Sequence, residues 1–301
     1  MPLDGFDSLY RDANARTGPV RVAAAGGDDP TVLEALRIAA DRGWVEPILV
    51  GPEPRIRAIA DSRGISLDGF AIRHAEGTAI AAAAVAEVKS GNARALMKGQ
   101  IATPALMEAV LDPTAGLRSG RVICQVVLME IPRDDRRFLM ADTGICVTPD
   151  LRKRIEILQE SVAVAQALGS AKPKVALMAA TETVKATMPE TVEADELTRR
   201  NQQGEFGDCS IEGPLSFDLA YATEAGAKKQ VEGSVVGAAD IMLFPNLLSA
   251  NLTVKAIMYT ADCRFGGVLK GTTAPVVFMS RADTTATRLN SLALSLRILD
   301  H

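Results

Sequence analysis

The residues whose types and spacing most clearly suit binding or catalysis lie near the end of the chain, in the segment Ser280-Arg281-Ala282-Asp283. The apolar run Pro275–Met279 before them is typical of a strand, and the sequence after them has the apolar spacing of a helix. Ser280 is well placed as the N-cap of that helix, with Asp283 at the position of a capping-box carboxylate. Free backbone N–H groups at a helix start attract anions, and the forked guanidinium of Arg281 suits phosphate. The segment therefore predicts either a well-capped last helix or an anion site.

Further cations and hydroxyls follow other strand-like segments. The run Ala93–Gly99 is strand-like and ends with Lys98, and Thr103 before a proline is expected to cap the next helix. Arg118 and Arg121 lie in a loop before a long apolar strand. The turns after parallel strands all open at the carboxyl edge of the sheet, where ligands of α/β proteins bind. Arginines in loops are mostly solvated, but a cluster that converged near Lys98 would suit an anion.

Composition excludes several classes of protein. The 301 residues are 48% hydrophobic and 23% charged with a net charge of -4, and no basic tract or aromatic platform suggests nucleic acid as a partner. No apolar run approaches the ~20 residues of a membrane span. The four cysteines are widely spaced and only two histidines are present, which argues against a metal site. Reduced thiols and an acidic N-terminus without an apolar signal core lead us to expect a cytoplasmic protein.

Strand-like and helix-like segments alternate along the chain, which predicts an α/β fold with mostly parallel sheets. Asp29 with Pro30 and the segment from Asp150 to Leu168 carry clear helix signals. Gly26-Gly27 could approach a phosphate but lacks the GxGxxG spacing of a dinucleotide site. Strands are expected at 20–25, 44–51, 71–75, 93–99, 122–131, 138–142, 174–180, 209–214, 239–244, 266–270 and 275–279.

The hairpin-like turn Pro132–Arg137 interrupts this alternation and indicates a change of sheet. We therefore expect two α/β/α domains with a central cleft for the substrate. Residues 1–148 and 275–301 form a first, discontinuous domain in this interpretation, and residues 149–274 form the second.

Several short segments, taken in order, resemble the phosphate acetyl/butyryl transferase family over nearly the whole chain, and they look closer to the butyryl branch. They are Leu96-Met97-Lys98-Gly99 with Thr103, Gly116-Leu117-Arg118-Ser119-Gly120-Arg121, Asp142 with Pro149-Asp150, Glu182-Thr183-Val184, Gly213-Pro214-Leu215 with Phe217-Asp218, Phe244-Pro245-Asn246, Asn251, Lys255, Pro275 and Ser280-Arg281-Ala282-Asp283.

The resemblance implies a two-domain fold like that of isocitrate and isopropylmalate dehydrogenases and a homodimer. It implies no metal and no redox cofactor: coenzyme A and phosphate are substrates, and the thiolate of coenzyme A attacks the carbonyl of an acyl phosphate. Ser280 and Arg281 match the family's Ser-Arg pair beside the reacting groups. Thr287 stands where the acetyl branch has an aspartate proposed as the base, and Cys146 replaces a common asparagine.

Acyl transfer of this kind requires an ionised thiol, a bound phosphate and a stabilised oxyanion. An ordinary thiol has a pKa near ~8.5, so Arg281 and the helix start at Ser280 are expected to favour its thiolate. We assign Ser280, Arg281 and Asp283 to catalysis, although Asp283 is equally suited to capping. The expected substrate-binding residues are Lys98, Thr103, Arg118, Arg121, Asp142, Asp218, Asn251 and Lys255.

Some of these assignments compete with structural roles. Asp218 suits a helix N-terminus, where a carboxylate complements the dipole. Asn251 and Lys255 lie one helical turn apart and both are able to line the cleft, or Lys255 is solvated. Two other functions remain open: a decarboxylating NAD-dependent hydroxyacid dehydrogenase of the same fold, and a non-catalytic protein that binds acyl-CoA or phosphate. The dehydrogenase needs clustered aspartates for a divalent metal, and the aspartates here are scattered.

Overall fold

A computed structural model describes residues 2–278, 280 and 282–301. The chain divides into two compact units. The terminal unit consists of Phe6–Arg121 and Phe265–His301, and the middle unit consists of Val122–Arg264 with the residues up to Gly5. The predicted domain boundaries at 148/149 and 274/275 do not coincide with the boundaries between these units, which follow Arg121 and Arg264. The domain assignment stays a prediction.

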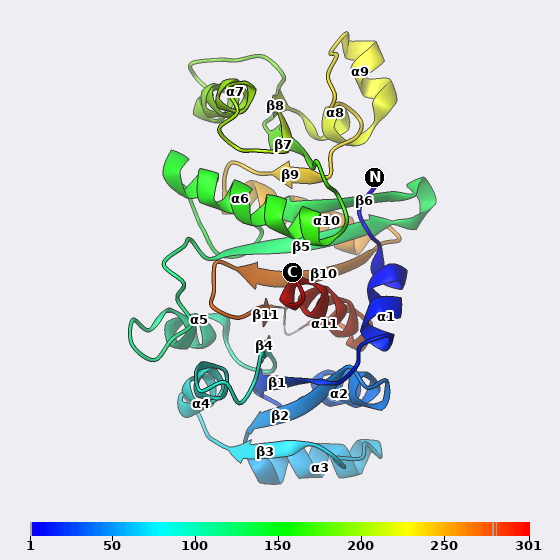
Figure 1. Cartoon of the computed structure of the whole chain (residues 1–301), viewed down its shortest axis with the longest axis vertical. Coiled ribbons are helices and arrows are strands. Elements are labelled where there is room, and N and C mark those ends of the chain that lie inside the picture. Colours follow the sequence, from blue (N-terminus) through cyan, green and yellow to red (C-terminus); the bar gives the residue numbers. More distant parts are fainter. Residues whose placement is uncertain (1, 279, 281) are drawn as a thin grey trace. The chain divides into compact units, whose positions relative to one another are not determined.

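The terminal unit alternates strands and helices, apart from its last hairpin (Figure 1). Its strands are β1 (Val20–Ala25), β2 (Val45–Gly51), β3 (Ala71–His74), β4 (Ala95–Lys98), β10 (Arg264–Lys270, which begins at the boundary) and β11 (Val276–Val277). Its helices are α1 (Phe6–Asn14), α2 (Pro30–Asp41), α3 (Glu53–Arg63), α4 (Ala79–Lys89), α5 (Thr103–Leu111) and α11 (Thr285–Leu299).

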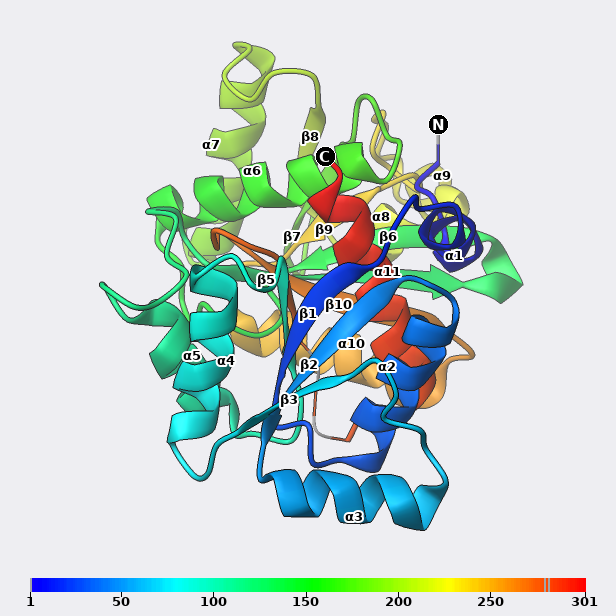
Figure 2. The ribbon, with the colours of Figure 1, turned by 60° about the horizontal axis from the view of Figure 1, so that its bottom comes forward.

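These strands lie in the order β3-β2-β1-β4-β11-β10, and every described pairing is parallel except that of β10 with β11. Helices α4 and α5 cover one face of the strands, and α1, α2 and α11 lie on the other (Figure 2). Because both faces are covered, the central strands β1 and β4 are almost entirely buried and apolar. These two strands contain two charged residues: Arg21 of β1 is exposed, and Lys98, the last residue of β4, is buried.

The middle unit has a second, smaller set of strands in the order β5-β6-β9-β7-β8. They are β5 (Cys124–Ile131), β6 (Arg136–Ala141), β7 (Lys174–Met178), β8 (Ser210–Leu215) and β9 (Ile241–Leu243). Its helices are α6 (Leu151–Ala167), α7 (Pro189–Gln202), α8 (Phe217–Tyr221), α9 (Thr223–Lys229), α10 (Leu247–Thr260) and a short 3-10 turn at Pro132–Asp134.

The structure confirms the predicted mixed α/β fold with mostly parallel strands. In the middle unit only β5 and β6 pair antiparallel, through the predicted hairpin, and β6, β9, β7 and β8 are all parallel. Asp29 caps α2 as predicted, and Asp150, in the segment where a helix was predicted to begin, caps α6; each accepts a hydrogen bond from a backbone N–H of the first turn. The single helix expected between Phe217 and Lys229 is instead two short helices, because the backbone is extended at Ala222.

None of the described helices combines the length and the hydropathy that crossing a bilayer demands. In the described part of the chain, no three His, Cys, Asp or Glu side chains are arranged to hold a metal ion. Cys124, Cys146, Cys209 and Cys263 are all free thiols.

Candidate active site

The Ser280 segment forms a closed turn of its own before the last helix. The backbone N–H of Ser280 donates to Asp283 Oδ2 at 2.6 Å, and the N–H of Ala282 donates to Ser280 Oγ at 3.3 Å. The last helix, α11, begins only at Thr285 and is capped by Thr284, whose Oγ1 accepts from the N–H of Thr287. The prediction that the helix begins at Ser280 is therefore wrong. The hydrogen bond from Ser280 N–H to the Asp283 carboxylate is the one expected of a capping box, but it closes a separate turn, and the Thr284 hydroxyl caps the helix itself. Arg281 lies outside the described residues.

Strand pairing brings the Ser280 turn to the same sheet edge as Lys98. Strand β11 lies parallel to β4 with Val277 opposite Met97, and β1 lies on the other side of β4 with Ala25 opposite Lys98. Because the three strands run in the same direction, the chain leaves all of them at one carboxyl edge. The register confirms that the Lys98 and Ser280 turns leave the sheet together. We call this place the cationic edge, defined by the turns that follow β1, β4 and β11.

Two glycines let the turns of the cationic edge approach closely. A Cβ at Gly99 would lie 2.1 Å from the carbonyl oxygen of Gly26, which no side chain tolerates. Gly26 itself has a φ of 81°, in the left-handed region that favours glycine. The N–H of Gln100 donates to the Gly26 carbonyl at 2.8 Å and fixes this approach. Gly26 and Gly99 therefore allow the turns after β1 and β4 to pack against each other.

Lys98 is buried within the terminal unit, with 1% of its surface exposed. Its Nζ donates to the carbonyl of Gly99 at 3.4 Å. An ammonium group held away from bulk water interacts more strongly with an arriving anion than an exposed one does. Lys98 is therefore suited to hold a phosphate.

Arg288 on α11 is a second buried cation at the cationic edge, and the sequence analysis did not select it. Its side chain is fully buried, and its Nε donates to Thr31 Oγ1 at 2.8 Å. Its Nη1 donates to the carbonyl of Lys98 at 3.4 Å. Burial lowers the pKa of Arg288, and the charges of Asp29 and Asp283 oppose that change. The signal in the sequence was an arginine in a leucine-rich last helix, and the structure buries every residue of that helix from Thr287 to Leu296.

Three predicted phosphate ligands take positions other than those expected. Thr103 is the first residue of α5 and exposed, and the N-cap is Ala102, so the predicted capping role of Thr103 is wrong. The backbone of Arg118 pairs with Thr272, and Ser119 Oγ donates to the carbonyl of Gly271 at 2.6 Å.

Residues 271–272 follow β10, and the Ser280 turn follows β11. The antiparallel pairing of these two strands therefore puts the backbone of Arg118 at the opposite end of the hairpin from Ser280. Arg121 is exposed and lies in the same loop as Arg118, because its backbone N–H donates to Ser119 Oγ. The structure thus does not bring the backbone of either arginine to the cationic edge.

In the middle unit, the loop that follows β6 is built around a buried carboxylate. Asp142 follows β6 and is 4% exposed. Its Oδ1 accepts from the N–H groups of Gln125, Gly144 and Ile145 at 2.9–3.1 Å, and its Oδ2 accepts from Cys146 N–H at 2.8 Å. Burial raises the pKa of the Asp142 carboxyl above its ordinary value, and the four N–H donors partly oppose that change. Asp142 therefore organises the loop that follows β6.

Cys146 in the same loop is not an activated nucleophile. Burial, followed by the neighbouring Asp142 carboxylate, raises the pKa of its thiol to about 11. A thiol with that pKa remains protonated near neutral pH, and only the thiolate is a strong nucleophile.

Asn251 on α10 is tied to the Asp142 loop, because its Nδ2 donates to the carbonyl of Thr143 at 3.0 Å. Lys255 lies one turn further along α10 and is exposed. The structure therefore brings Asp142 and Asn251 together. It places Lys255 on the same helix as Asn251, with its side chain in solvent.

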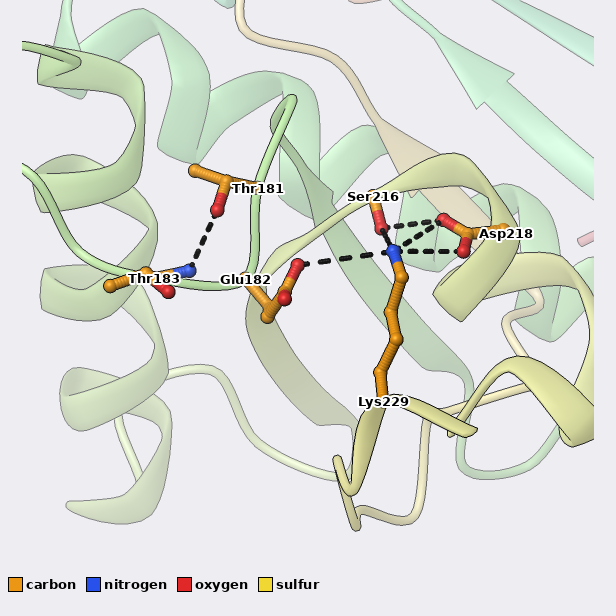
Figure 3. A network of polar contacts seen from close by, with 6 residues as sticks. All are labelled: Thr181, Glu182, Thr183, Ser216, Asp218 and Lys229. Carbon is orange, nitrogen blue, oxygen red and sulfur yellow. Dashed lines mark hydrogen bonds and ion pairs between the residues drawn. The ribbon is translucent and has the colours of Figure 1, made fainter. Parts of the chain in front are cut away.

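Asp218 belongs to a separate ionic cluster at the carboxyl ends of β7 and β8 (Figure 3). Lys229 Nζ lies 2.8 Å from Asp218 Oδ2 and 4.0 Å from Glu182 Oε2, and it donates to Ser216 Oγ at 3.1 Å. The ion pair with Lys229 and the Ser216 hydroxyl lower the pKa of Asp218, and the pKa of Lys229 is raised in return. A lysine with a raised pKa is a poor general base, so this cluster joins loops and does not activate Ser216. The sequence analysis did not select Lys229, which carries no local motif.

The carboxyl edge of the middle unit separates its predicted residues. Asp142 follows β6 and Asp218 follows β8, with β9 and β7 between them. Three strand spacings amount to about 14 Å. The structure therefore groups the predicted residues into three sets: Lys98 with Ser280 and Asp283, Asp142 with Asn251, and Asp218 with Lys229.

Comparison with known proteins identifies close relatives. A family described as "Phosphate acetyl/butaryl transferase" matches residues 75–296. The chain is 38% identical to a phosphate butyryltransferase of Clostridium acetobutylicum over 91% of this chain and 92% of that protein. It is 35% identical to a phosphate acetyltransferase of Thermotoga maritima over 93% of this chain and 96% of that protein. The crystal structure of a branched-chain phosphotransacylase from Enterococcus faecalis superposes with a TM-score of 0.83 at 30% identity, covering 94% of this chain and 99% of that one.

Proposed function

The chain belongs to the phosphate acetyl/butyryl transferase family, and from that premise we propose that it exchanges a short-chain acyl group between coenzyme A and inorganic phosphate. The reaction is acyl-CoA + phosphate = acyl phosphate + CoA. In the reverse direction, the thiolate of coenzyme A attacks the carbonyl carbon of the acyl phosphate. The carbon–oxygen bond to phosphate then breaks, and its electron pair leaves with the phosphate.

The observation that carries the proposal is the parallel register of β4 with β11, which gathers Lys98 and the Ser280 turn at one edge. A phosphate dianion needs cations and N–H or O–H donors that converge, and Lys98 is a buried cation there. We assign phosphate binding to Lys98 and Arg281, and stabilisation of the carbonyl oxyanion to the Ser280 hydroxyl. A donor of this kind contributes about 3 kcal/mol to transition-state stabilisation.

The remaining assignments concern the base and the rest of the substrate-binding surface. Asp283 is the nearest candidate base to Ser280, with its Oδ2 already accepting from the Ser280 N–H. Asp142 and Asn251 are proposed to form one part of a substrate-binding surface through their shared loop. Thr103, Arg118, Arg121, Asp218 and Lys255 stay candidate substrate-binding residues and need independent tests.

The acyl group we propose is butyryl or a similar short chain. The support is the 38% identity to a phosphate butyryltransferase and the likeness to a branched-chain phosphotransacylase. A phosphate acetyltransferase at 35% identity keeps acetyl in the series to be tested. Rates with acetyl-, propionyl-, butyryl- and longer-chain CoA rank the substrates directly.

We propose that the protein is a homodimer in the cytoplasm, in which α10 faces a second copy. Leu248, Leu252 and Tyr259 on this helix are 69%, 60% and 78% exposed, and their spacing puts them on one face. Exposed apolar faces of this kind are typical of subunit interfaces. The mass measured by light scattering tests the dimer. The two-domain division into 1–148 with 275–301 and 149–274, and the likeness to isocitrate and isopropylmalate dehydrogenases, belong to the same proposal.

The decisive assay is the release of free thiol from butyryl-CoA with and without phosphate. Thiol release that requires phosphate supports the transferase. Reduction of NAD by a hydroxyacid and a divalent metal would instead support the dehydrogenase. Binding of butyryl-CoA or phosphate without any turnover would support a non-catalytic binding protein.

A further inference from the structure

Arg288 is the buried charge at the cationic edge whose direct contacts are all neutral. Its Nε donates to the Thr31 hydroxyl and its Nη1 to the carbonyl of Lys98. Its Nη2 is buried and has no hydrogen-bond partner among the described residues. The guanidinium therefore keeps unused donor capacity in a place that water does not reach.

The carboxylates that influence Arg288 do so without a direct hydrogen bond. Asp29 and Asp283 oppose the pKa change that burial causes. Asp29 Oδ1 already accepts from Thr31 Oγ1 at 2.6 Å and from the N–H of Val32 at 3.1 Å. Asp283 Oδ2 accepts from the Ser280 N–H. The positive charge of Arg288 is therefore only partly compensated by the protein.

Arg154 in the middle unit is a buried arginine with a carboxylate in direct contact, although its Nε, like Nη2 of Arg288, has no hydrogen-bond partner among the described residues. It is 7% exposed, its Nη1 lies 2.8 Å from Glu193 Oε2, and its Nη2 donates to the carbonyl of Pro245 at 2.8 Å. Arg154 has a carboxylate in direct contact, and Arg288 has none among the described residues.

A buried cation without a carboxylate in contact costs stability, because the desolvation of the charge is not offset by a close opposite charge. Such a group is expected where it serves binding or catalysis, since function commonly retains residues that stability alone would not. Arg288 also binds the backbone of the turn that carries Lys98, so two buried cations share one edge. Two like charges near each other favour the arrival of an anion.

We propose that Arg288 is a positioning residue that makes the cationic edge selective for phosphate. Its buried charge attracts the dianion, and its hydrogen bond to the Lys98 carbonyl holds the Lys98 turn in place, while its own side chain stays out of contact with solvent and substrate. The proposal rests on the proposed acyltransferase function, because phosphate is the substrate whose binding it explains.

The test compares Arg288→Met, which keeps the volume and removes the charge, with Arg288→Lys, which keeps the charge. Arg154→Met is the matched control, because it removes a buried arginine that has a carboxylate partner. The measurements are the KM for phosphate, the KM for butyryl-CoA, the thermal midpoint, and calorimetric titration with inorganic phosphate.

We expect Arg288→Met to raise the KM for phosphate at least about tenfold, or ~1.4 kcal/mol, and to leave the KM for butyryl-CoA within about twofold. Its thermal midpoint is expected to equal or exceed that of the wild type. Arg288→Lys should keep the phosphate KM within about threefold of wild type, because the charge remains. Arg154→Met should lower the midpoint, because Glu193 Oε2 and the carbonyl of Pro245 lose their shared partner, with the phosphate KM unchanged.

An unchanged phosphate KM in Arg288→Met would overturn the proposal, and so would a lower midpoint accompanied by equal losses for both substrates. If the wild type binds phosphate but transfers no acyl group, and Arg288→Met no longer binds phosphate, then the role of the Arg288 charge stands and the proposed function fails. If the wild type transfers acyl groups and Arg288→Met binds phosphate normally, the function stands and the role of Arg288 fails.

Discussion

In the middle unit the buried charges Asp142 and Arg154 have direct partners, whereas in the terminal unit the buried guanidinium of Arg288 contacts only neutral acceptors. Asp142 accepts four backbone N–H groups, and Arg154 contacts Glu193. Arg288 is fully buried beside the Lys98 turn and retains an unpartnered Nη2 among the described residues. The difference indicates that Asp142 and Arg154 hold loops of the middle unit in shape, while the charge of Arg288, which no carboxylate contacts, attracts an anion to the cationic edge without touching it. Burial alone therefore does not tell a structural charge from a functional one, and the nature of its contacts does.

Lys98→Met is expected to have the largest effect of any change in this comparison. Removing the buried cation should lower turnover about 10²–10³-fold, because the charge that stabilises the phosphate in the transition state is lost. Steady-state kinetics with butyryl-CoA and phosphate measures the effect. Lys89→Met, at an exposed lysine in the last turn of α4, is the control and should retain wild-type turnover. A Lys98→Met enzyme with near-normal turnover would remove the cationic edge from the mechanism.

Asp142→Asn is expected to be the most destabilising change in the middle unit. An asparagine amide offers one oxygen, so a backbone N–H that now bonds to the carboxylate would face an NH₂ group. Leaving buried donors unsatisfied should lower the free energy of unfolding by about 2–3 kcal/mol. Urea unfolding measures it, and Asp218→Asn at an exposed carboxylate is the matched control with a smaller effect expected. Equal stability of Asp142→Asn and the wild type would contradict the structural role of this carboxylate.

Cys146 provides a pH test of the same loop. Its pKa is raised from 9.0 to about 11, so the folded protein holds the thiol proton more tightly than the unfolded chain. The resulting stabilisation is present below about pH 9 and is lost as the pH rises towards about 11. The thermal midpoint of the wild type should therefore fall relative to that of Cys146→Ala over this range. A difference between the two midpoints that is constant with pH would show that the thiol is not held protonated by its surroundings.

Lys229→Met should have the smallest effect. Its partners Asp218 and Glu182 are partly exposed, and ion pairs in such surroundings contribute little to stability. We expect the thermal midpoint to change by less than about 2 °C and turnover to remain close to that of the wild type. Differential scanning fluorimetry and the thiol-release assay measure both. A large loss of turnover at an unchanged thermal midpoint would instead indicate that Asp218 and Lys229 take part in substrate binding.

Much of the fold was predictable because local patterns and strand order agree. The apolar run at 20–25, the Asp29 cap, the start of a long helix near Asp150 and the hairpin at 132–137 all lie where the sequence places them. The start of the last helix was predicted wrongly, because Ser280 and Thr284 are both good caps, and the bond from Ser280 N–H to Asp283 that suits a capping box closes a turn that ends before the helix begins. Thr103 failed as a cap for a similar reason, since the helix begins one residue earlier than its cap signal implies.

By itself, the sequence determined the alternation of strands and helices, the family, and the residue types that suit phosphate and a thiol. These features depend on local periodicity and on the order of short motifs along the chain. Only the tertiary structure decided which of those residues meet. Strand pairing put Ser280 beside Lys98 and the backbone of Arg118 at the other end of its hairpin, and helix packing buried Arg288 against the Lys98 carbonyl. Neighbours across a sheet or beneath a helix are set by long-range packing, and no short window of sequence contains both members of such a pair.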